Sequence, residues 1–249
     1  MQTTFRTDAV VVRSAKVGSS DRLLTLLTAD RGVIKAYANS AENPKNKLHA
    51  SCNLFCYGDF LVYDGGKELK IVECELKEIF YDLRVDILTL AMAQYFCELA
   101  ADLSAGGGEN GQEILRLTLN SFYYLSHALL PPALLKPVYE LRLISDVGFM
   151  PSLVACGNCG AFETDPMYFS PVRGVLRCAE CGPADGTYKK ICLDAVSAMR
   201  QICYADLKQV FALRVSGDAL RELSDCSERY LLERAGRQFG TLSFLKTLY

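Results

Sequence analysis

The sequence contains no tryptophan and only two histidines, His49 and His127, among its 249 residues. Two imidazoles leave little from which to build a Ser/His/Asp arrangement or a histidine-rich catalytic metal site. No G-x-x-x-x-G-K-[ST] loop occurs, so the usual cradle of nucleotide hydrolysis is missing. The glycines Gly106, Gly108 and Gly111 fit the spacing G-x-G-x-x-G, but they lie between two predicted helices and not after a strand, so they are more simply a linker than a dinucleotide site. These absences predict a protein that is not an enzyme.

Long apolar runs are also missing: no 18 consecutive residues are apolar, and the start, MQTTFRTDAVVVRS, lacks the pattern of an export signal. Hydrophobic residues make up 50% of the chain and charged residues 22%, which is typical of a globular protein. Seven cysteines are scattered over apolar faces, as expected for reduced thiols in a cytoplasm: Cys52, Cys56, Cys74, Cys97, Cys192, Cys203 and Cys226. We therefore expect a cytoplasmic protein without a membrane span.

The other four cysteines form two C-x2-C pairs separated by 18 residues, namely Cys156 with Cys159 and Cys178 with Cys181. Two thiolates on one tight turn can face one ion, and two such turns supply the four ligands of a tetrahedral zinc site. The glycine that follows each pair allows the backbone to bend around the metal. Such a closed site is structural, because it leaves no position for a catalytic water. Two disulfides, unpaired buried thiols, or iron in place of zinc are the alternatives.

Charge is unevenly distributed, although the net charge is only −2. Residues 1–50 carry eight Lys or Arg against four Asp or Glu, a balance of +4, whereas residues 81–155 carry four against eight, a balance of −4. A general attraction for nucleic acid is therefore not expected. Any binding of that kind needs a local basic patch.

The first 80 residues predict short strands separated by turns. Segments rich in β-branched and apolar residues alternate with Gly, Asn and Asp. The predicted strands are 7–16, 22–28, 33–38, 52–63 and 68–76. Five short strands over this length predict a small closed barrel, of which the OB-fold is the five-stranded member. The pattern alone does not separate an OB-fold from an SH3-like barrel.

Apolar residues then change to helical spacing. The predicted helices are 82–103, 112–130, 133–147, 193–204 and 218–237, with a short helical turn in 240–249, and Gly106-Gly107-Gly108 is expected to link the first two. We therefore expect a multidomain α+β chain. An OB-fold domain spans 1–80, an α-helical domain comprises 81–155 and 190–249, and a four-cysteine zinc ribbon with strands at 168–170 and 174–176 is inserted at 156–189.

Several segments, taken in order and with their spacing, resemble the RecO family of bacterial recombination mediators over nearly the whole chain. They are GSSDRLLTL at 18–26, DRG at 30–32, AENPKNKL at 41–48, YELRLI at 139–144, GFMP at 148–151, YFSP at 168–171 and LSFL at 242–245. The resemblance implies a non-enzymatic role. RecO-like proteins bind single- and double-stranded DNA, anneal complementary strands, contact the acidic tail of single-stranded DNA-binding protein, and pair with RecR to load RecA. It also implies a cytoplasmic, nucleoid-associated location.

For the barrel, this resemblance implies a groove with cations on the phosphates and aromatic rings under the bases. The candidate cations are Arg13, Lys16, Arg22, Arg31, Lys35, Lys45 and Lys47, and the candidate stacking residues are Tyr37 and Tyr57. A solvated barrel face is an equally good interpretation of any one of these cations. Each tyrosine is more simply interpreted as packing.

The chain departs from the family pattern at positions that are often basic, now occupied by Glu42, Asn43, His49, Gly240 and Ser243. Because removal of any phosphate contact weakens binding, we expect weaker DNA affinity than is usual in the family. The alternative is that binding has moved toward the zinc ribbon, to Arg173, Arg177, Lys189 and Lys190.

A second function class is a protein–protein adaptor that docks RecR and single-stranded DNA-binding protein and touches DNA only weakly. The acidic middle helices and the apolar C-terminal segment favour it. The acidic tail of single-stranded DNA-binding protein would need cations to bind it, and the candidates on the third predicted helix are Lys136 and Arg142. Ordinary helix-surface charges are the alternative interpretation of both.

Overall fold

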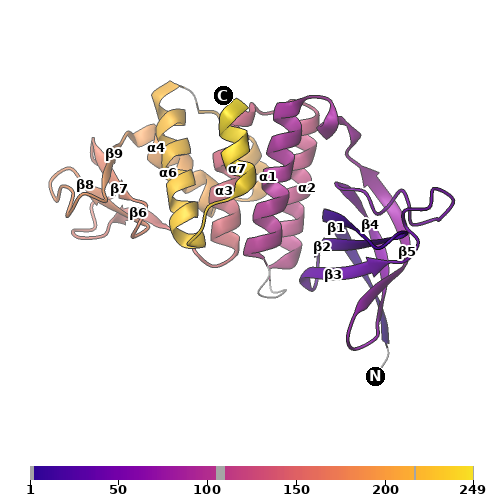
Figure 1. Ribbon diagram of the computed structural model, residues 1–249. Coiled ribbons are helices and arrows are strands. Elements are labelled where there is room, and N and C mark those ends of the chain that lie inside the picture. Colours follow the sequence, from indigo (N-terminus) through magenta and orange to yellow (C-terminus); the bar gives the residue numbers. More distant parts are fainter. Residues whose placement is uncertain (1–2, 105–109, 216, 249) are drawn as a thin grey trace. The chain divides into compact units, whose positions relative to one another are not determined.

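The computed structural model describes residues 3–104, 110–215 and 217–248 (Figure 1). These residues form two compact units. The first contains the described residues up to His127 together with those from Phe239 onward, and the second contains Ala128–Gln238. The N-terminal and C-terminal segments of the chain therefore belong to the same unit.

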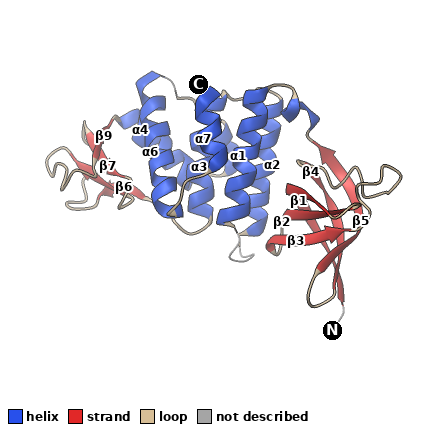
Figure 2. Ribbon diagram, viewed as in Figure 1, coloured by secondary structure: helices blue, strands red, loops and turns tan. Residues whose placement is uncertain are grey.

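The first unit begins with five strands that close into a barrel in the order β1-β2-β3-β5-β4 (Figure 2). The strands are β1 (Thr3–Val17), β2 (Asp21–Thr28), β3 (Gly32–Ala38), β4 (Cys56–Asp64) and β5 (Leu69–Ile79). Strands β3 and β5 pair in parallel, and the other neighbours are antiparallel. All five predicted strands are present, with bounds that differ by a few residues.

The barrel core arises from alternation, because successive side chains of a strand point to opposite faces. Every second residue of β4 is buried, and the other strands add apolar residues to the same interior. This core includes Val11, Leu24, Leu26, Ala36, Phe60, Val62 and Ile71. Burial of these side chains is the main favourable term in the stability of the barrel.

A turn-rich segment, residues 39–55, connects β3 to β4 and contributes Leu48 and Cys52 to the barrel core. The prediction of a strand from Cys52 was wrong at its start, because β4 begins only at Cys56. The Cys52 N–H donates to the Leu48 carbonyl at 3.1 Å, which is a helical-turn bond, and Phe55 takes a positive φ of 67°. Both features are incompatible with an extended strand.

Helices complete the first unit: a 3₁₀ turn at Tyr81–Arg84, α1 (Ile87–Leu103), α2 (Gly111–Ser126), α7 (Gly240–Leu245) and a 3₁₀ turn at Lys246–Leu248. The predicted helix from residue 82 starts later, because the Asp86 side chain caps α1 by accepting from the Thr89 N–H at 2.9 Å. The predicted helix 112–130 ends at Ser126, since Ala128 has a φ of 51°. The glycines Gly106-Gly107-Gly108 lie outside the described residues.

The second unit contains α3 (Pro132–Asp146), α4 (Leu193–Tyr204), α5 (Leu207–Phe211) and α6 (Gly217–Ala235), and α6 packs against α3 and α4. Helix α5 was not predicted, because five residues are too few to show a helical period. None of the helices in the described part of the chain is long and apolar enough to cross a membrane.

A small sheet lies between α3 and α4 in the chain and has the strand order β6-β8-β7-β9. Its strands are β6 (Ser152–Cys156), β7 (Met167–Ser170), β8 (Val175–Cys178) and β9 (Lys189–Ile191). Prediction found the hairpin of β7 and β8 but missed the two edge strands. Strand β6 pairs with β8 irregularly, and β9 has only three residues, so neither produces a clear alternating pattern.

Candidate metal centre and nucleic-acid interface

The two C-x2-C pairs lie at the ends of β6 and β8, and the sheet brings them together. The Sγ atoms of Cys156, Cys159, Cys178 and Cys181 all lie within 4.8 Å of one another. The two turns have the same hydrogen bond, with the N–H of Gly160 and of Gly182 donating at 3.0 Å to the carbonyl of the first cysteine of the pair. Both glycines have a positive φ, 77° and 58°, as the predicted bend requires.

Hydrogen-bond donors surround these sulfurs. The Asn158 N–H lies 3.5 Å from Cys156 Sγ, the Cys181 N–H lies 3.4 Å from Cys178 Sγ, and Asn158 Nδ2 lies 3.3 Å from Cys181 Sγ. Burial opposes ionisation of the Cys156 thiol, but the nearby N–H groups outweigh it and lower its pKa to about 6. At Cys159 the Ala161 N–H favours the thiolate, while the three neighbouring sulfurs prevail and raise the pKa to about 12.

The donor set fits a metal ion. Four sulfurs at about 2.3 Å from one zinc lie within about 4 Å of one another, and the present cluster is only slightly wider. One thiolate is favoured by its surroundings, and the others would ionise as a divalent cation replaces their protons. None of the eleven cysteines of the chain forms a disulfide. The four cysteines can therefore hold one metal ion in a closed sulfur site.

At the barrel, all three predicted DNA-contacting arginines are already engaged in ion pairs. Arg22 Nε lies 2.5 Å from Glu42 Oε1, and its Nη1 donates to Asn53 Oδ1 at 3.0 Å, so this side chain ties the 39–55 segment to β2. Arg13 pairs with Asp102 of α1 at 3.0 Å. Arg31 lies 3.6 Å from a carboxylate oxygen of the adjacent Asp30, at the other end of β2 from Arg22.

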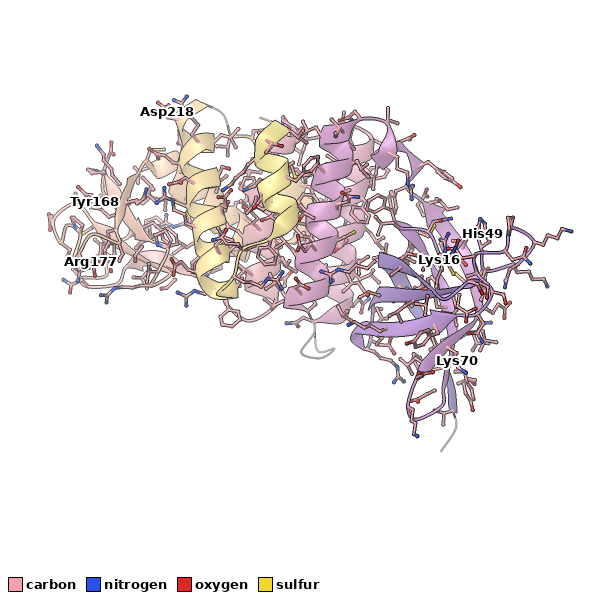
Figure 3. The ribbon with its side chains drawn as sticks, in the orientation of Figure 1. Lys16, His49, Lys70, Tyr168, Arg177 and Asp218 are labelled. Atoms are coloured by element: carbon pink, nitrogen blue, oxygen red, sulfur yellow. The ribbon has the colours of Figure 1, made fainter. Side chains whose placement is uncertain are left out.

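The four predicted lysines differ from the arginines. Lys16, Lys35, Lys45 and Lys47 are exposed, and none of them makes an ion pair with another residue that the structure describes. Lys16 and His49, labelled in Figure 3, are both close enough to Glu42 to help lower the pKa of its carboxyl, an effect led by the Arg22 hydrogen bond. The structure therefore places Lys16, Arg22 and His49 near one carboxylate, that of Glu42 in the 39–55 segment. It places Arg31 elsewhere.

The two predicted stacking tyrosines also differ from each other. The Tyr57 hydroxyl donates to Asp8 Oδ2 at 3.4 Å, and Lys77 Nζ lies 5.6 Å from the ring centroid, so this ring is occupied by neighbouring side chains. Tyr37 on β3 is half-buried and lies opposite Leu23 of β2. The ring contacts therefore favour Tyr37 over Tyr57 as a platform for a base.

The predicted tail-binding cations are not surface charges. Lys136 is buried, with Nζ 2.7 Å from Glu140 Oε1 and 2.9 Å from Glu228 Oε2. Burial opposes its charge, but the two carboxylates outweigh burial and raise the pKa of the lysine. Arg142 pairs with Asp146 at 3.0 Å and donates to the Ala205 carbonyl at 2.6 Å. An acidic tail would have to displace these partners, and tail binding at these two residues stays a prediction.

Comparison with known proteins agrees with the resemblance drawn from the sequence. Residues 1–80 match the family described as "Recombination protein O N terminal", and residues 84–243 match "Recombination protein O C terminal". A "DNA repair protein RecO" from Acetivibrio thermocellus is 32% identical over 244 residues, which covers 98% of this chain and 97% of that protein. Proteins of the same name from Desulforudis audaxviator and Symbiobacterium thermophilum are 30% and 28% identical, with the same two coverages. The chain belongs to the RecO family of DNA repair proteins.

Proposed function

We propose that this protein is a non-catalytic recombination mediator that binds single- and double-stranded DNA and anneals complementary strands. In this proposal it acts with RecR to load RecA onto strands covered by single-stranded DNA-binding protein. The observation that carries the proposal is membership of the RecO family along both parts of the chain. A DNA mediator of this kind works at the chromosome, so we also place it in the cytoplasm at the nucleoid.

The barrel supports the DNA-binding part of the proposal. Its strand order, with β3 parallel to β5, agrees with a five-stranded Greek-key barrel, and we assign it to the OB type. Lys45 and Lys47 lie exposed on the 39–55 segment, and Lys16 lies exposed near the end of β1. Cations without carboxylate partners are free to replace the counterions of a phosphate backbone. We assign the principal phosphate contacts to these three lysines and a weaker one to Lys35.

Glu42 explains why weaker binding than the family norm is expected. Its carboxylate pairs with Arg22 and lies close enough to Lys16 and His49 to interact with them electrostatically. The net positive charge of this region is therefore smaller than the number of its cations suggests. Arg13 and Arg31 are likewise engaged with acidic neighbours. These ion pairs are also the specific observation that favours the second candidate, an adaptor for RecR and single-stranded DNA-binding protein with minor DNA contact.

We further propose that the four-cysteine group holds zinc. The ion would fix the two turns and would supply no chemistry beyond stability, because four protein sulfurs close its coordination shell. Metal analysis of purified protein tests this assignment. We expect one zinc per chain and no visible absorption. Iron in the site would give a coloured protein and would replace zinc in the proposal.

An oligonucleotide titration separates the mediator from the adaptor. Fluorescence anisotropy of a labelled single strand is measured at low and moderate salt with the unaltered protein and with a Lys45→Ala, Lys47→Ala variant. We expect affinity that falls steeply with salt and a slope reduced by about 0.7 for each phosphate contact removed. A matched control removes two exposed cations of the second unit, Lys208→Ala and Arg221→Ala. Binding that is indifferent to salt and to the barrel variant would leave only the adaptor.

A further inference from the structure

The outer face of the small sheet carries a row of cationic and aromatic side chains. Tyr168 of β7 lies directly opposite Arg177 of β8 on one side and opposite Lys190 of β9 on the other. Residues opposite each other on neighbouring strands point to the same face of a sheet. Arg177, Tyr168 and Lys190 therefore form a continuous cross-strand row, and Figure 3 labels the first two on this sheet.

Burial identifies which face this is. Met167 and Phe169, on either side of Tyr168, are fully buried, and so is Leu176 beside Arg177. The Phe169 ring contacts Tyr230 of α6 with centroids 5.9 Å apart, so this face packs against the helices of the unit. The row lies on the opposite face, where Tyr168 and Arg177 are partly exposed and Lys190 is exposed.

The row carries free positive charge and a second aromatic ring. Arg177 Cζ lies 5.6 Å from the Tyr188 ring centroid, which places that ring beside the row. Neither Arg177 nor Lys190 forms an ion pair with any residue that the structure describes. Two acidic groups of this unit are already paired with other cations, Asp185 with Arg173 at 2.8 Å and Asp225 with Lys189 at 3.5 Å.

We propose that this face is a second binding surface for single-stranded DNA, with Arg177 and Lys190 on phosphates and Tyr168 and Tyr188 stacking on bases. Alternation of cations with aromatic rings on a sheet is the arrangement that holds unpaired strands, because only unpaired bases expose their flat faces. A duplex offers phosphates but no free base faces, and an acidic peptide offers neither bases nor a reason for two tyrosines. The inference rests on the proposed DNA-binding role and adds a surface outside the barrel.

The test uses full-length, metal-loaded protein and a labelled single strand of thymidines. An Arg177→Gln, Lys190→Gln variant should bind about tenfold more weakly, and its salt slope should be smaller by about 0.7 for each phosphate that it no longer neutralises. The control Lys208→Gln, Arg221→Gln removes the same charge from exposed positions on other elements and should bind as the unaltered protein does. Metal content and thermal midpoint confirm that each variant is folded.

Substitution of Tyr168 separates stacking from charge. Tyr168→Phe keeps the ring and should retain affinity, whereas Tyr168→Ser should weaken binding about fivefold or more without changing the salt slope. Equal loss in the two variants would assign the role to the hydroxyl and would contradict stacking.

Photo-crosslinking locates the bound strand independently of affinity. A single strand containing bromodeoxyuridine is irradiated with the protein, and crosslinked peptides are identified by mass spectrometry. We expect crosslinks at Tyr168 or Tyr188 that a duplex of the same sequence does not form. Crosslinks confined to residues 1–80, together with unchanged affinity of the Arg177→Gln, Lys190→Gln variant, would overturn the second surface and leave the proposed function intact. Absence of all DNA binding would overturn both.

Discussion

The barrel and the small sheet each hold a group of cysteines, and the group in the small sheet differs in containing a thiol, Cys156, whose pKa is lowered. In the barrel, Cys52 and Cys74 lie near each other, and burial raises the pKa of their thiols to about 11 and about 12. In the small sheet, N–H donors on tight turns lower the pKa of Cys156 to about 6. The number of thiols in a region therefore does not make a metal site. A candidate metal site needs paired turns that direct both the sulfurs and the N–H groups toward one point.

The two regions are also stabilised differently. The barrel has strands of 7 to 15 residues around a continuous apolar core. The small sheet has strands of 3 to 5 residues and can bury few side chains. A region of that size usually depends on a cross-link or a metal. The barrel should accordingly tolerate loss of the metal, and the small sheet should not.

Removal of the metal should have the largest effect. A structural zinc contributes on the order of 10 kcal/mol of binding free energy to folding. After treatment with a chelator, amides of residues 152–191 should exchange with solvent much faster, while amides of the barrel keep their protection. Hydrogen exchange followed by mass spectrometry of peptides measures both regions at once. Cys156→Ser should reproduce the effect and Cys56→Ser should not. Unchanged exchange in 152–191 after complete metal removal would show that the sheet stands on its packing alone.

The next largest effect should come from the barrel core. Phe60 is fully buried, and Phe60→Ala should reduce the stability of the barrel by about 3–5 kcal/mol because it removes apolar contacts and leaves a cavity. Urea titration followed by exchange of barrel amides measures the change, and metal content should stay the same. Val72 on β5 is 53% exposed, so Val72→Ala serves as the control, with a change within about 0.5 kcal/mol. Loss of metal on Phe60→Ala would mean that the two regions are not independent.

Thiol reactivity should separate the two cysteine groups directly. In metal-depleted protein near neutral pH, Cys156 should react with iodoacetamide at least about a hundredfold faster than Cys52 and Cys74, because only the thiolate reacts and burial suppresses it in the barrel. A time course of modified peptides gives the rates. Metal-loaded protein is the control, since bound metal protects the ribbon. Similar alkylation rates for Cys156 and for the barrel thiols Cys52 and Cys74 in the metal-depleted protein would contradict the difference in pKa between the two regions.

The smallest effect concerns cations. Glu42→Gln should release Arg22 for a phosphate and steepen the salt dependence of single-strand binding by about 0.7 in slope. Glu75→Gln, an exposed change of equal charge on β5, is the control.

Glu42 also affects stability as the pH changes. Because the Arg22 hydrogen bond lowers the pKa of Glu42 below its ordinary value of 4.5, the pair stabilises the protein at pH values above 4.5. Its contribution is lost as the pH falls through the lowered pKa. The Glu42→Gln variant should not show this pH-dependent loss of stability in an acid titration. Identical salt slopes for Glu42→Gln and Glu75→Gln would contradict the role of Glu42.

Local patterns predicted much of this structure. The ligand cysteines stand three residues apart in two pairs, so their convergence could be expected from spacing alone. Apolar and β-branched segments bounded by turn residues likewise located every barrel strand. Long-range partners could not be predicted: Lys136 is buried because Glu228, 92 residues away, lies beside it, and Arg22 is held by Asn53, 31 residues away. Arg177 and Lys190 were named from the sequence as alternative cations near the ribbon, but their alignment with Tyr168 could not be predicted, since β9 shows its register only after pairing with β7.

Helix α7 lies with the first unit, where its residues Leu242 and Leu245 are buried and the Thr241 N–H donates to Glu98 of α1 at 3.0 Å. These residues follow the second unit in the sequence, so the ribosome synthesises them only after the whole second unit. The first unit therefore cannot acquire its final form during synthesis until α7 has emerged. A protein cut just before residue 239 would carry a complete second unit and an incomplete first one.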